Sequence, residues 1–351
     1  MCFPLELEMQ PSNELKIMEP LPKAIWAGTP IEKRLTFMNN EMIAPHPEMV
    51  VAIRAISQRK NRCLNENKGA AIFIEVPSGG GKTTLVRFFK AAMPDHVSDE
   101  ETKVLVISFQ VPKIITLKQM EKALLTALGD PKAGSGKHYD LDERSTTLLR
   151  TAGTELILID NIQDIPEKRR AGGIRQIGNW IRDLIDDSRR LVVLLGTEDS
   201  REILQSNIQL KRRCPAKRTI AYFNPLDKLG LNRLGRFLRE IDKRLPLAEL
   251  SGLGDEDNET TRQFAFATGG IQDYIFQILS AAVSHAATEG REKLTSEDLA
   301  TAYEETFQEL SKGINPFRGE ANRILDQEGE PLHGLLGNPP PKNGMKRGKS
   351  N

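Results

Sequence analysis

Residues 72–84 of the chain read IFIEVPSGGGKTT, and this stretch decides the fold that the sequence predicts. Its first residues have the pattern of a buried strand, three successive glycines follow, and Lys82 and Thr83 open an amphipathic helix. In such a turn the backbone N–H groups converge on phosphate oxygens, the lysine reaches the terminal phosphates, and the hydroxyl binds Mg²⁺. The stretch therefore predicts a phosphate-binding loop that holds ATP together with Mg²⁺.

The residues expected to bind the nucleotide form the loop and the first helical turn: Pro77, Ser78, Gly79, Gly80, Gly81, Lys82, Thr83 and Thr84. One position departs from the pattern G-x-x-x-x-G-K-[ST], because Val76 stands where the first glycine is expected. A valine lacks the freedom of glycine to adopt a positive φ, so the turn has to begin differently. Pro77 and the three glycines offer an alternative path.

A second apolar run, residues 156–159, ends in Asp160. In a phosphate-loop protein such an acid holds Mg²⁺ beside the hydroxyl of the loop, so Thr83 and Asp160 are the expected metal ligands. In many ATPases of this kind a glutamate follows and polarises the attacking water, but the next residue here is Asn161, which cannot accept a proton. We therefore expect slow hydrolysis. Asp164 is a nearby substitute, although a loop carboxylate more often caps a helix.

A third apolar run, residues 191–195, leads into Gly196 and Thr197. A polar side chain at the end of a strand beside the loop strand can contact the γ-phosphate or the attacking water, so Thr197 is a candidate sensor. Capping of the next helix, residues 198–204, is the alternative role. Strands that alternate with helices in this way predict an α/β fold with a mainly parallel sheet sandwiched by helices and a ligand at the carboxyl ends of the strands.

Residues 168–218 carry 13 basic and 6 acidic side chains. An arginine just beyond the last core helix can reach the γ-phosphate of a neighbouring subunit, where a fixed cation stabilises the charge of the transition state. Arg212 and Arg213 are the candidates for this role, with a salt bridge or a DNA phosphate as the competing use. The residues expected to act in catalysis are thus Lys82, Asp160, Asn161, Thr197, Arg212 and Arg213.

The alternation of strands and helices stops after residue 222, which predicts a division of the chain into four parts. We expect an extended proline-bearing arm at 1–30 and a nucleotide-binding core with a helical N-terminal segment at 31–222. A small helical lid follows at 223–313, in which residues 295–298 resemble a capping box. A polar, flexible tail follows at 314–351.

The overall composition sets limits on function. Lys and Arg total 49 against 48 Asp and Glu, so any nucleic-acid surface has to be local. Three cysteines that are far apart argue against a disulfide framework or a metal cluster. No apolar run reaches the roughly 18 residues of a membrane-spanning helix, so we expect a soluble, cytoplasmic protein without a membrane partner.

The chain resembles AAA+ ATPases and, more narrowly, the TniB/TnsC family of transposition regulators. The resemblance covers roughly residues 31–317 and lies mainly in the order of six segments. These segments are residues 34–47, 76–84, 196–197, 209–213, 268–270 and 315–317.

The resemblance implies a function on DNA. ATP-bound subunits of that family assemble as a homo-oligomer, a ring or a helical filament, around double-stranded DNA. They connect a target-selection protein, often of the TniQ type, to a DDE transposase, and ATP hydrolysis disassembles the oligomer. By position, DNA phosphates would contact Lys113, Thr116 and Lys118, in the turn and helix after the second strand. The competing interpretation of these three residues is a solvated helix start.

Two other functions remain open at this point. Asn161 favours a nucleotide-binding scaffold on DNA with little or no hydrolysis. The same fold also serves replication factors and helicase loaders, and a fold alone does not choose between them.

Overall fold

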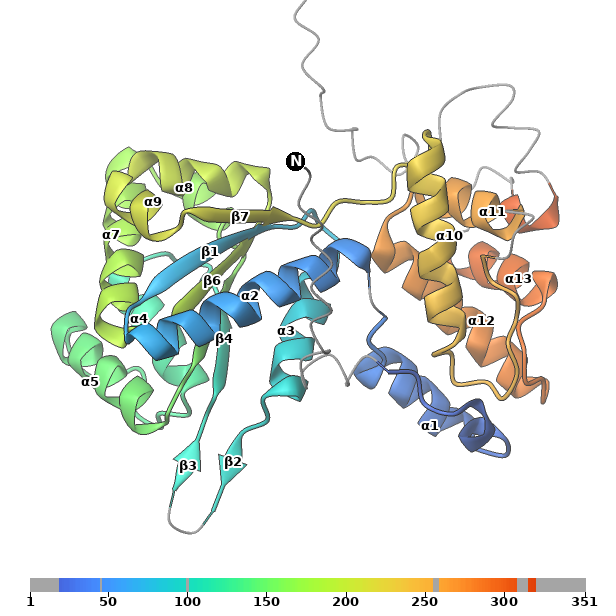
Figure 1. The fold of residues 1–351 in the computed structure, drawn as a ribbon, viewed down its shortest axis with the longest axis horizontal. Coiled ribbons are helices and arrows are strands. Elements are labelled where there is room, and N and C mark those ends of the chain that lie inside the picture. The colour runs from blue at the N-terminus through green and yellow to red at the C-terminus, as the bar shows by residue number, and fades with distance from the viewer. Residues whose placement is uncertain (1–18, 45, 99–100, 255–258, 308–314, 320–351) are drawn as a thin grey trace, which may run out of the picture. The chain divides into compact units, whose positions relative to one another are not determined.

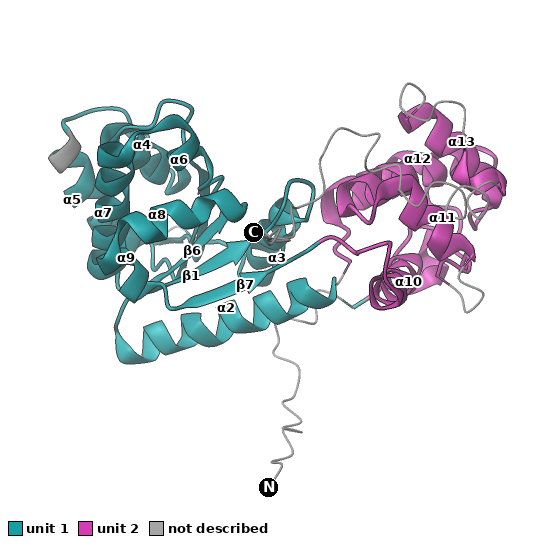
Figure 2. Ribbon diagram, turned by 90° about the horizontal axis from the view of Figure 1, so that it is seen from above, with its two compact units in different colours: residues 1–19, 46–221 teal, residues 20–45, 222–351 magenta. Residues whose placement is uncertain are grey.

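A computed structural model describes residues 19–44, 46–98, 101–254, 259–307 and 315–319. The chain forms two compact units, which Figure 2 shows in different colours. Unit 1 contains residues 1–19 and 46–221, and unit 2 contains residues 20–45 and 222–351. Most of the expected N-terminal arm and of the expected C-terminal tail lies outside the described residues.

A parallel sheet of five strands forms the centre of unit 1, in the order β4-β5-β6-β1-β7 (Figure 1). The strands are β1 (Ala70–Glu75), β4 (Val106–Gln110), β5 (Leu156–Asp160), β6 (Leu191–Gly196) and β7 (Ala216–Thr219). Every neighbouring pair in this sheet is parallel. Their apolar sequences suit strands that are buried on both faces. The predicted α/β architecture is therefore confirmed.

Helices flank this sheet. They are α2 (Pro47–Glu66), α3 (Lys82–Ala92), α4 (Leu117–Ala127), α5 (His138–Thr151), α6 (Asp164–Lys168), α7 (Ala171–Ser188), α8 (Arg201–Ser206) and α9 (Ile208–Arg213). Ala71 and Phe73 of β1 belong to a core that α4 and α7 complete, whereas α2 contacts β1, β6 and β7. Ile72 and Ile74, on the other face of β1, are also fully buried. Helices therefore cover both faces.

A short antiparallel hairpin, β2 (His96–Val97) and β3 (Thr102–Lys103), stands between α3 and β4. A short 3₁₀ helix, η4 (Glu198–Ser200), connects β6 to α8. Neither element has the long apolar periodicity on which the sequence analysis depends.

Unit 2 is helical. Its elements are η2 (Lys23–Trp26), α1 (Ile31–Thr36), η3 (Phe37–Glu41), α10 (Lys228–Asp242), α11 (Glu259–Thr268), α12 (Gln272–Thr288), α13 (Ser296–Phe307) and η5 (Pro316–Arg318). The capping box expected before α13 is present, because Asp298 N donates to Thr295 Oγ1 at 3.2 Å and Thr295 N donates to Asp298 Oδ2 at 2.8 Å. Reciprocal bonds of this kind fix where a helix begins.

The N-terminal segment belongs to unit 2, whereas the sequence analysis divided residues 20–45 between the arm and the nucleotide core. Met38, Met42 and Ala44 pack in the same buried core as α10 and α11. Arg34, which is 4% exposed, donates to both carboxylate oxygens of Glu292 at 2.7 and 2.8 Å. Glu292 lies 258 residues after Arg34 in the chain, so local periodicity does not reveal this partner.

Candidate nucleotide-binding site

The loop between β1 and α3 takes a path that needs no glycine at position 76. Val76 is fully buried, and its N–H donates to the Gly196 carbonyl at 2.8 Å, so the chain continues alongside β6 before it turns. The left-handed backbone angles fall instead on Gly79, with φ 70°, and on Gly81, with φ 95°. Side chains rarely adopt such angles. The departure from the usual pattern thus moves the turn within the glycine run.

Lys82 opens α3, and its side chain lies against the loop. Nζ donates to the carbonyls of Val76 and Pro77, each at 3.2 Å. Burial lowers the pKa of Lys82, and the charge of Asp160 acts in the opposite direction. No side chain caps the N-terminus of α3, and Thr83 is exposed in its first turn. The N-terminal N–H groups are therefore available to an anion.

Asp160 is the last residue of β5. In the sheet, β6 lies between β5 and β1, the strand that leads into the loop. Burial raises the pKa of Asp160, while a hydrogen bond from Asn161 N at 2.7 Å and the charge of Lys82 act against that rise. Within the described residues no group of three or more His, Cys, Asp or Glu side chains forms a metal cluster. Mg²⁺ would therefore have to share its coordination with nucleotide oxygens, Thr83 and Asp160.

Asn161 has a left-handed backbone, with φ 59°. Its Oδ1 accepts a hydrogen bond from Gln163 Nε2 at 3.2 Å. Asn tolerates this backbone region better than Glu does. Asp164, the substitute base considered above, forms an ion pair with Lys168 one helical turn later. That pairing argues against Asp164 as a base for water.

Thr197 follows β6 and does not act as a helix cap. Its side chain makes no capping hydrogen bond to η4, and its Oγ1 is buried without a hydrogen-bond partner among the described residues. The capping alternative is therefore wrong. Buried polar atoms are rarely left unpaired in proteins unless a water or ligand completes them.

Two further buried polar atoms lie near the end of β6, next to Thr197. The sequence did not predict a role for them. Ser200 Oγ and Gln163 Oε1 have no hydrogen-bond partner in the described part of the chain. A Cβ placed on Gly196 would lie 2.1 Å from Ser200 Oγ and 3.1 Å from Gln163 Oε1, so both atoms flank the end of β6. The available sequence signal was their position, three residues after the end of β5 for Gln163 and four residues after the end of β6 for Ser200.

Glu75, the last residue of β1, was also missed. Arg201 of α8 donates to its two carboxylate oxygens at 2.7 and 2.9 Å, and Lys217 of β7 lies 2.7 Å from Oε2. Burial alone would raise the pKa of Glu75, but these two cations hold it below its usual value. The start of the loop is thus tied to β7 and to the helix that follows β6.

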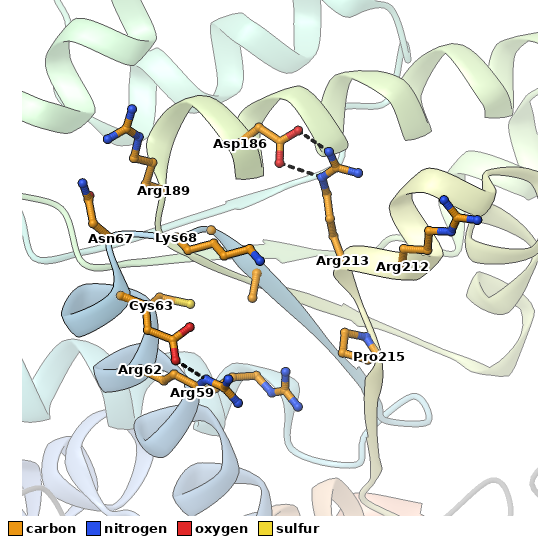
Figure 3. A pocket seen from close by; sticks show the side chains of 13 residues that line it. Arg59, Arg62, Cys63, Asn67, Lys68, Asp186, Arg189, Arg212, Arg213 and Pro215 are labelled. Carbon is orange, nitrogen blue, oxygen red and sulfur yellow. Dashed lines mark hydrogen bonds and ion pairs between the residues drawn. The ribbon is translucent and has the colours of Figure 1, made fainter.

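The structure does not bring Arg212 and Arg213 to the loop of their own chain. They end α9, just before β7 begins, so they lie at the amino end of the sheet, whereas the loop follows the carboxyl end of β1. Arg213 donates to Asp186 Oδ1 at 2.6 Å and Oδ2 at 2.5 Å, which is the salt-bridge alternative (Figure 3). Arg212 is exposed.

The three candidate DNA contacts share one turn after the carboxyl end of β4. Lys113 and Lys118 are exposed, and Ile114 between them is 71% exposed. Thr116 caps α4, because its Oγ1 accepts from Gln119 N at 3.2 Å. Two exposed cations therefore flank a helix N-terminus.

No described helix combines the length and the apolar character that a membrane span requires. No curated protein matches the chain. Among solved structures, the Aeropyrum pernix ORC2 protein in ADPNP and ADP complexes is similar with a TM-score of 0.53 and 15% identity, over 77% of this chain and 71% of that one. The Aeropyrum pernix ORC1 protein in complex with DNA is similar with a TM-score of 0.52 and 14% identity, over 87% and 85% of the two chains.

Cdc6p from Pyrobaculum aerophilum is similar with a TM-score of 0.50 and 13% identity, over 90% of this chain and 88% of that one. At such identities these likenesses show the fold, which is that of AAA+ P-loop ATPases. The family model described as bacterial TniB protein matches residues 34–221. Because that match spans more than half of the chain, the protein belongs to the TniB family.

Proposed function

We propose that the protein is an ATP-dependent, DNA-binding regulator of transposition. In this role it oligomerises on double-stranded DNA and connects a TniQ-type target-selection protein to a DDE transposase. One observation carries the proposal: a phosphate loop, an acid and an unpaired hydroxyl follow the carboxyl ends of the adjacent strands β1, β5 and β6, in a chain of the TniB family.

Each residue of this site has a task in the proposed ATPase reaction. Lys82 leaves the loop carbonyls to contact the terminal phosphates, and the N-terminus of α3 holds the remaining phosphate oxygens. Thr83 and Asp160 would hold Mg²⁺, which would supply positive charge beside the phosphate oxygens. Arg212 is the cation for the γ-phosphate of a neighbouring copy, because Asp186 already engages Arg213.

Water is oriented by amides and a hydroxyl, without a carboxylate base. Gln163 Oε1 and Thr197 Oγ1 are, with Ser200 Oγ, buried atoms at this end of the sheet that have no hydrogen-bond partner among the described residues, and Asn161 accepts from the Gln163 amide. Phosphoryl transfer passes through a loose transition state, so orientation of the water contributes more than early removal of its proton. Slow turnover follows, since no group at this position accepts the proton. The oligomer would then persist after assembly.

The exposed turn of Lys113, Thr116 and Lys118 is proposed to contact DNA phosphates. Contacts of this kind carry no sequence information, which suits a protein that assembles on many targets. Affinity for duplex DNA should fall steeply with salt concentration.

The proposal is tested by electron microscopy and sedimentation of the protein with a duplex and MgATP. We expect oligomers on DNA for the wild type and for Lys90→Ala, a matched control that removes an exposed lysine from the last turn of the same helix. Lys82→Ala should remain unassembled. A wild type that stays monomeric on duplex DNA with MgATP would overturn the proposal.

Asn161 favours a second candidate, a nucleotide-gated DNA scaffold that does not hydrolyse ATP. A phosphate-release assay with DNA and the transposase separates the two functions. The ATPase is supported if the protein releases phosphate above the no-enzyme background and Lys82→Ala abolishes this release. The scaffold is supported if the protein assembles on DNA without releasing phosphate.

A further inference from the structure

A pocket of about 600 Å³ opens at the opposite end of the sheet from the phosphate loop (Figure 3). It is lined by the end of α2 and the start of β1, by the connection from α7 to β6, and by the connection from α9 to β7. All three connections enter the amino ends of parallel strands. The nucleotide site and this pocket are therefore separate features of unit 1.

The pocket has an excess of positive charge. Its charged lining consists of six cations, Arg59, Arg62, Lys68, Arg189, Arg212 and Arg213, and of the two carboxylates Glu66 and Asp186. Both carboxylates are already engaged, since Arg62 Nε lies 2.8 Å from Glu66 and Arg213 Nη2 lies 2.5 Å from Asp186. Four cations are left without an ion pair or side-chain hydrogen bond among the described residues.

Figure 3 shows Lys68 between the Asp186–Arg213 pair on one side and Arg59 with Arg62 on the other. Gathering like charges around one concavity raises the free energy of the folded state, unless an anion is bound there. Helix C-termini attract cations, and α2, α7 and α9 all end at this pocket. Six cations line the pocket, however, so they outnumber the three helix ends.

The backbone fixes the place of two lining residues. Asn67 and Arg189, the C-caps of α2 and α7, both line the pocket with left-handed φ values of 48° and 55°. Left-handed residues commonly end helices, and asparagine tolerates this conformation well, whereas arginine rarely adopts it. A Cβ on Gly69 would lie 1.9 Å from the Ile185 carbonyl, so the connection from α2 to β1 is held against the last turn of α7.

We propose that this pocket binds a compact anion that carries two or more phosphate groups. Its volume is within the range of small-ligand sites. Guanidinium groups bind phosphate oxygens in bidentate fashion, and a lysine among them adds a point charge. The same phosphate chemistry has two possible sources, a free polyphosphate and the phosphodiester backbone of DNA.

The first experiment measures binding of inorganic tripolyphosphate by calorimetry on the full chain, without nucleotide and with EDTA. It uses the Lys82→Ala background, which removes the phosphate-loop lysine. We expect one remaining site, whose affinity falls at least about 10-fold when Arg59→Ala and Lys68→Ala are added. The matched control, Arg150→Ala with Lys132→Ala, removes two exposed cations of unit 1 outside the pocket and should leave the affinity unchanged.

The second experiment identifies the source. Binding of a short duplex is measured as a function of salt for the wild type, the pocket variant and the control. If the pocket contacts DNA, the slope of log affinity against log salt falls by about 2 in the pocket variant, roughly 1 for each cation removed. If duplex binding is unchanged while tripolyphosphate binding is lost, the source is a free polyphosphate. If Lys82→Ala has no tripolyphosphate site, or if the pocket variant binds like the control, the proposal is overturned.

This proposal shares only Arg212 with the proposed ATPase function, and the variants that test it leave Arg212 in place. Its first test is made with a chain that lacks the lysine of the phosphate loop. A protein that fails to assemble with ATP can therefore still bind tripolyphosphate in the pocket, and the two failures are distinguishable.

Discussion

The two ends of the parallel sheet in unit 1 differ in how the sequence builds them. At the carboxyl end, Asp160 is the last residue of β5 and Lys82 opens the helix after the loop, and each is recognisable in a short motif. At the amino end, cations come from three chain segments that no motif links, and folding alone brings them together. The charges of Lys82 and Asp160 interact at the first end, and Arg201 and Lys217 pair with Glu75, whereas four cations at the second end have no ion pair among the described residues. Local sequence patterns thus predict the site at the carboxyl end, whereas the excess of positive charge at the amino end becomes visible only in the folded structure.

The largest expected effect concerns the metal at the carboxyl end. Thr83→Ala should lower kcat for ATP hydrolysis about 1000-fold, because Mg²⁺ loses a direct ligand. Thr83→Ser keeps the hydroxyl and should restore most of the activity, measured as phosphate release. If the alanine variant hydrolyses ATP as fast as the serine variant, Thr83 does not bind the metal. The carboxyl end of the sheet would then lack the metal ligand that is proposed to distinguish it from the amino end.

A buried titratable group, Glu121, lies between two helices that cover the sheet of unit 1. Trp180 of α7 donates to Glu121 of α4, which is 1% exposed. Burial raises the pKa of Glu121 to about 7. A raised pKa means that the folded state prefers the proton, so stability is lost as the pH rises from about 4.5 to about 7.

Glu121→Gln removes that loss and should stabilise the protein at pH 8 relative to wild type, by up to about 3 kcal/mol, with little difference near pH 4.5. Thermal unfolding of both proteins across this pH range measures the effect. Glu143→Gln, on the exposed side of α5, serves as the control and should follow the wild type. Parallel curves for Glu121→Gln and wild type would show that Glu121 keeps an ordinary pKa.

Gln163 tests whether the unpaired atoms at the carboxyl end act on water. Gln163→Ala should lower kcat roughly 10- to 100-fold and leave KM within about twofold, because the water is misplaced while ATP binding is kept. Gln163→Asn keeps an amide with a shorter reach and should recover part of kcat. A change in KM alone would assign Gln163 to nucleotide binding.

Asn161→Glu is expected to have the smallest effect. A carboxylate at this position should raise hydrolysis by a few fold, since it can accept the proton of the water. The left-handed backbone of Asn161 opposes the change and should lower stability by about 1 kcal/mol. Phosphate release and thermal unfolding measured together separate the two effects. Unchanged hydrolysis would mean that the backbone points a residue at 161 away from the water.

The strands and the loop were predictable because burial on both faces and phosphate binding each leave a contiguous pattern, as in residues 72–84 and 156–160. The place of residues 20–45 was not predictable, because Met38 packs against helices that begin after residue 227 and Arg34 pairs with Glu292, 258 residues later. The roles of Gln163 and Ser200 depend on what surrounds each side chain after folding. The proposed roles of Arg212 and of Lys113, Thr116 and Lys118 stay predictions, because they depend on DNA or on a second copy.

The path of the chain between the two units has a consequence for synthesis. Residues 20–45 leave the ribosome before residues 46–221, and most of unit 2 follows only after residue 221. At about 5 to 20 residues per second, the segment waits on the order of 10 to 40 s for its partners. Throughout that interval Met38 and Met42 have no core to enter, so the nascent chain exposes an apolar segment while its nucleotide-binding half is already able to fold. Residues 20–45 would then pack into their core only after unit 1 has been synthesised, and until that moment the exposed segment would be a binding site for a chaperone.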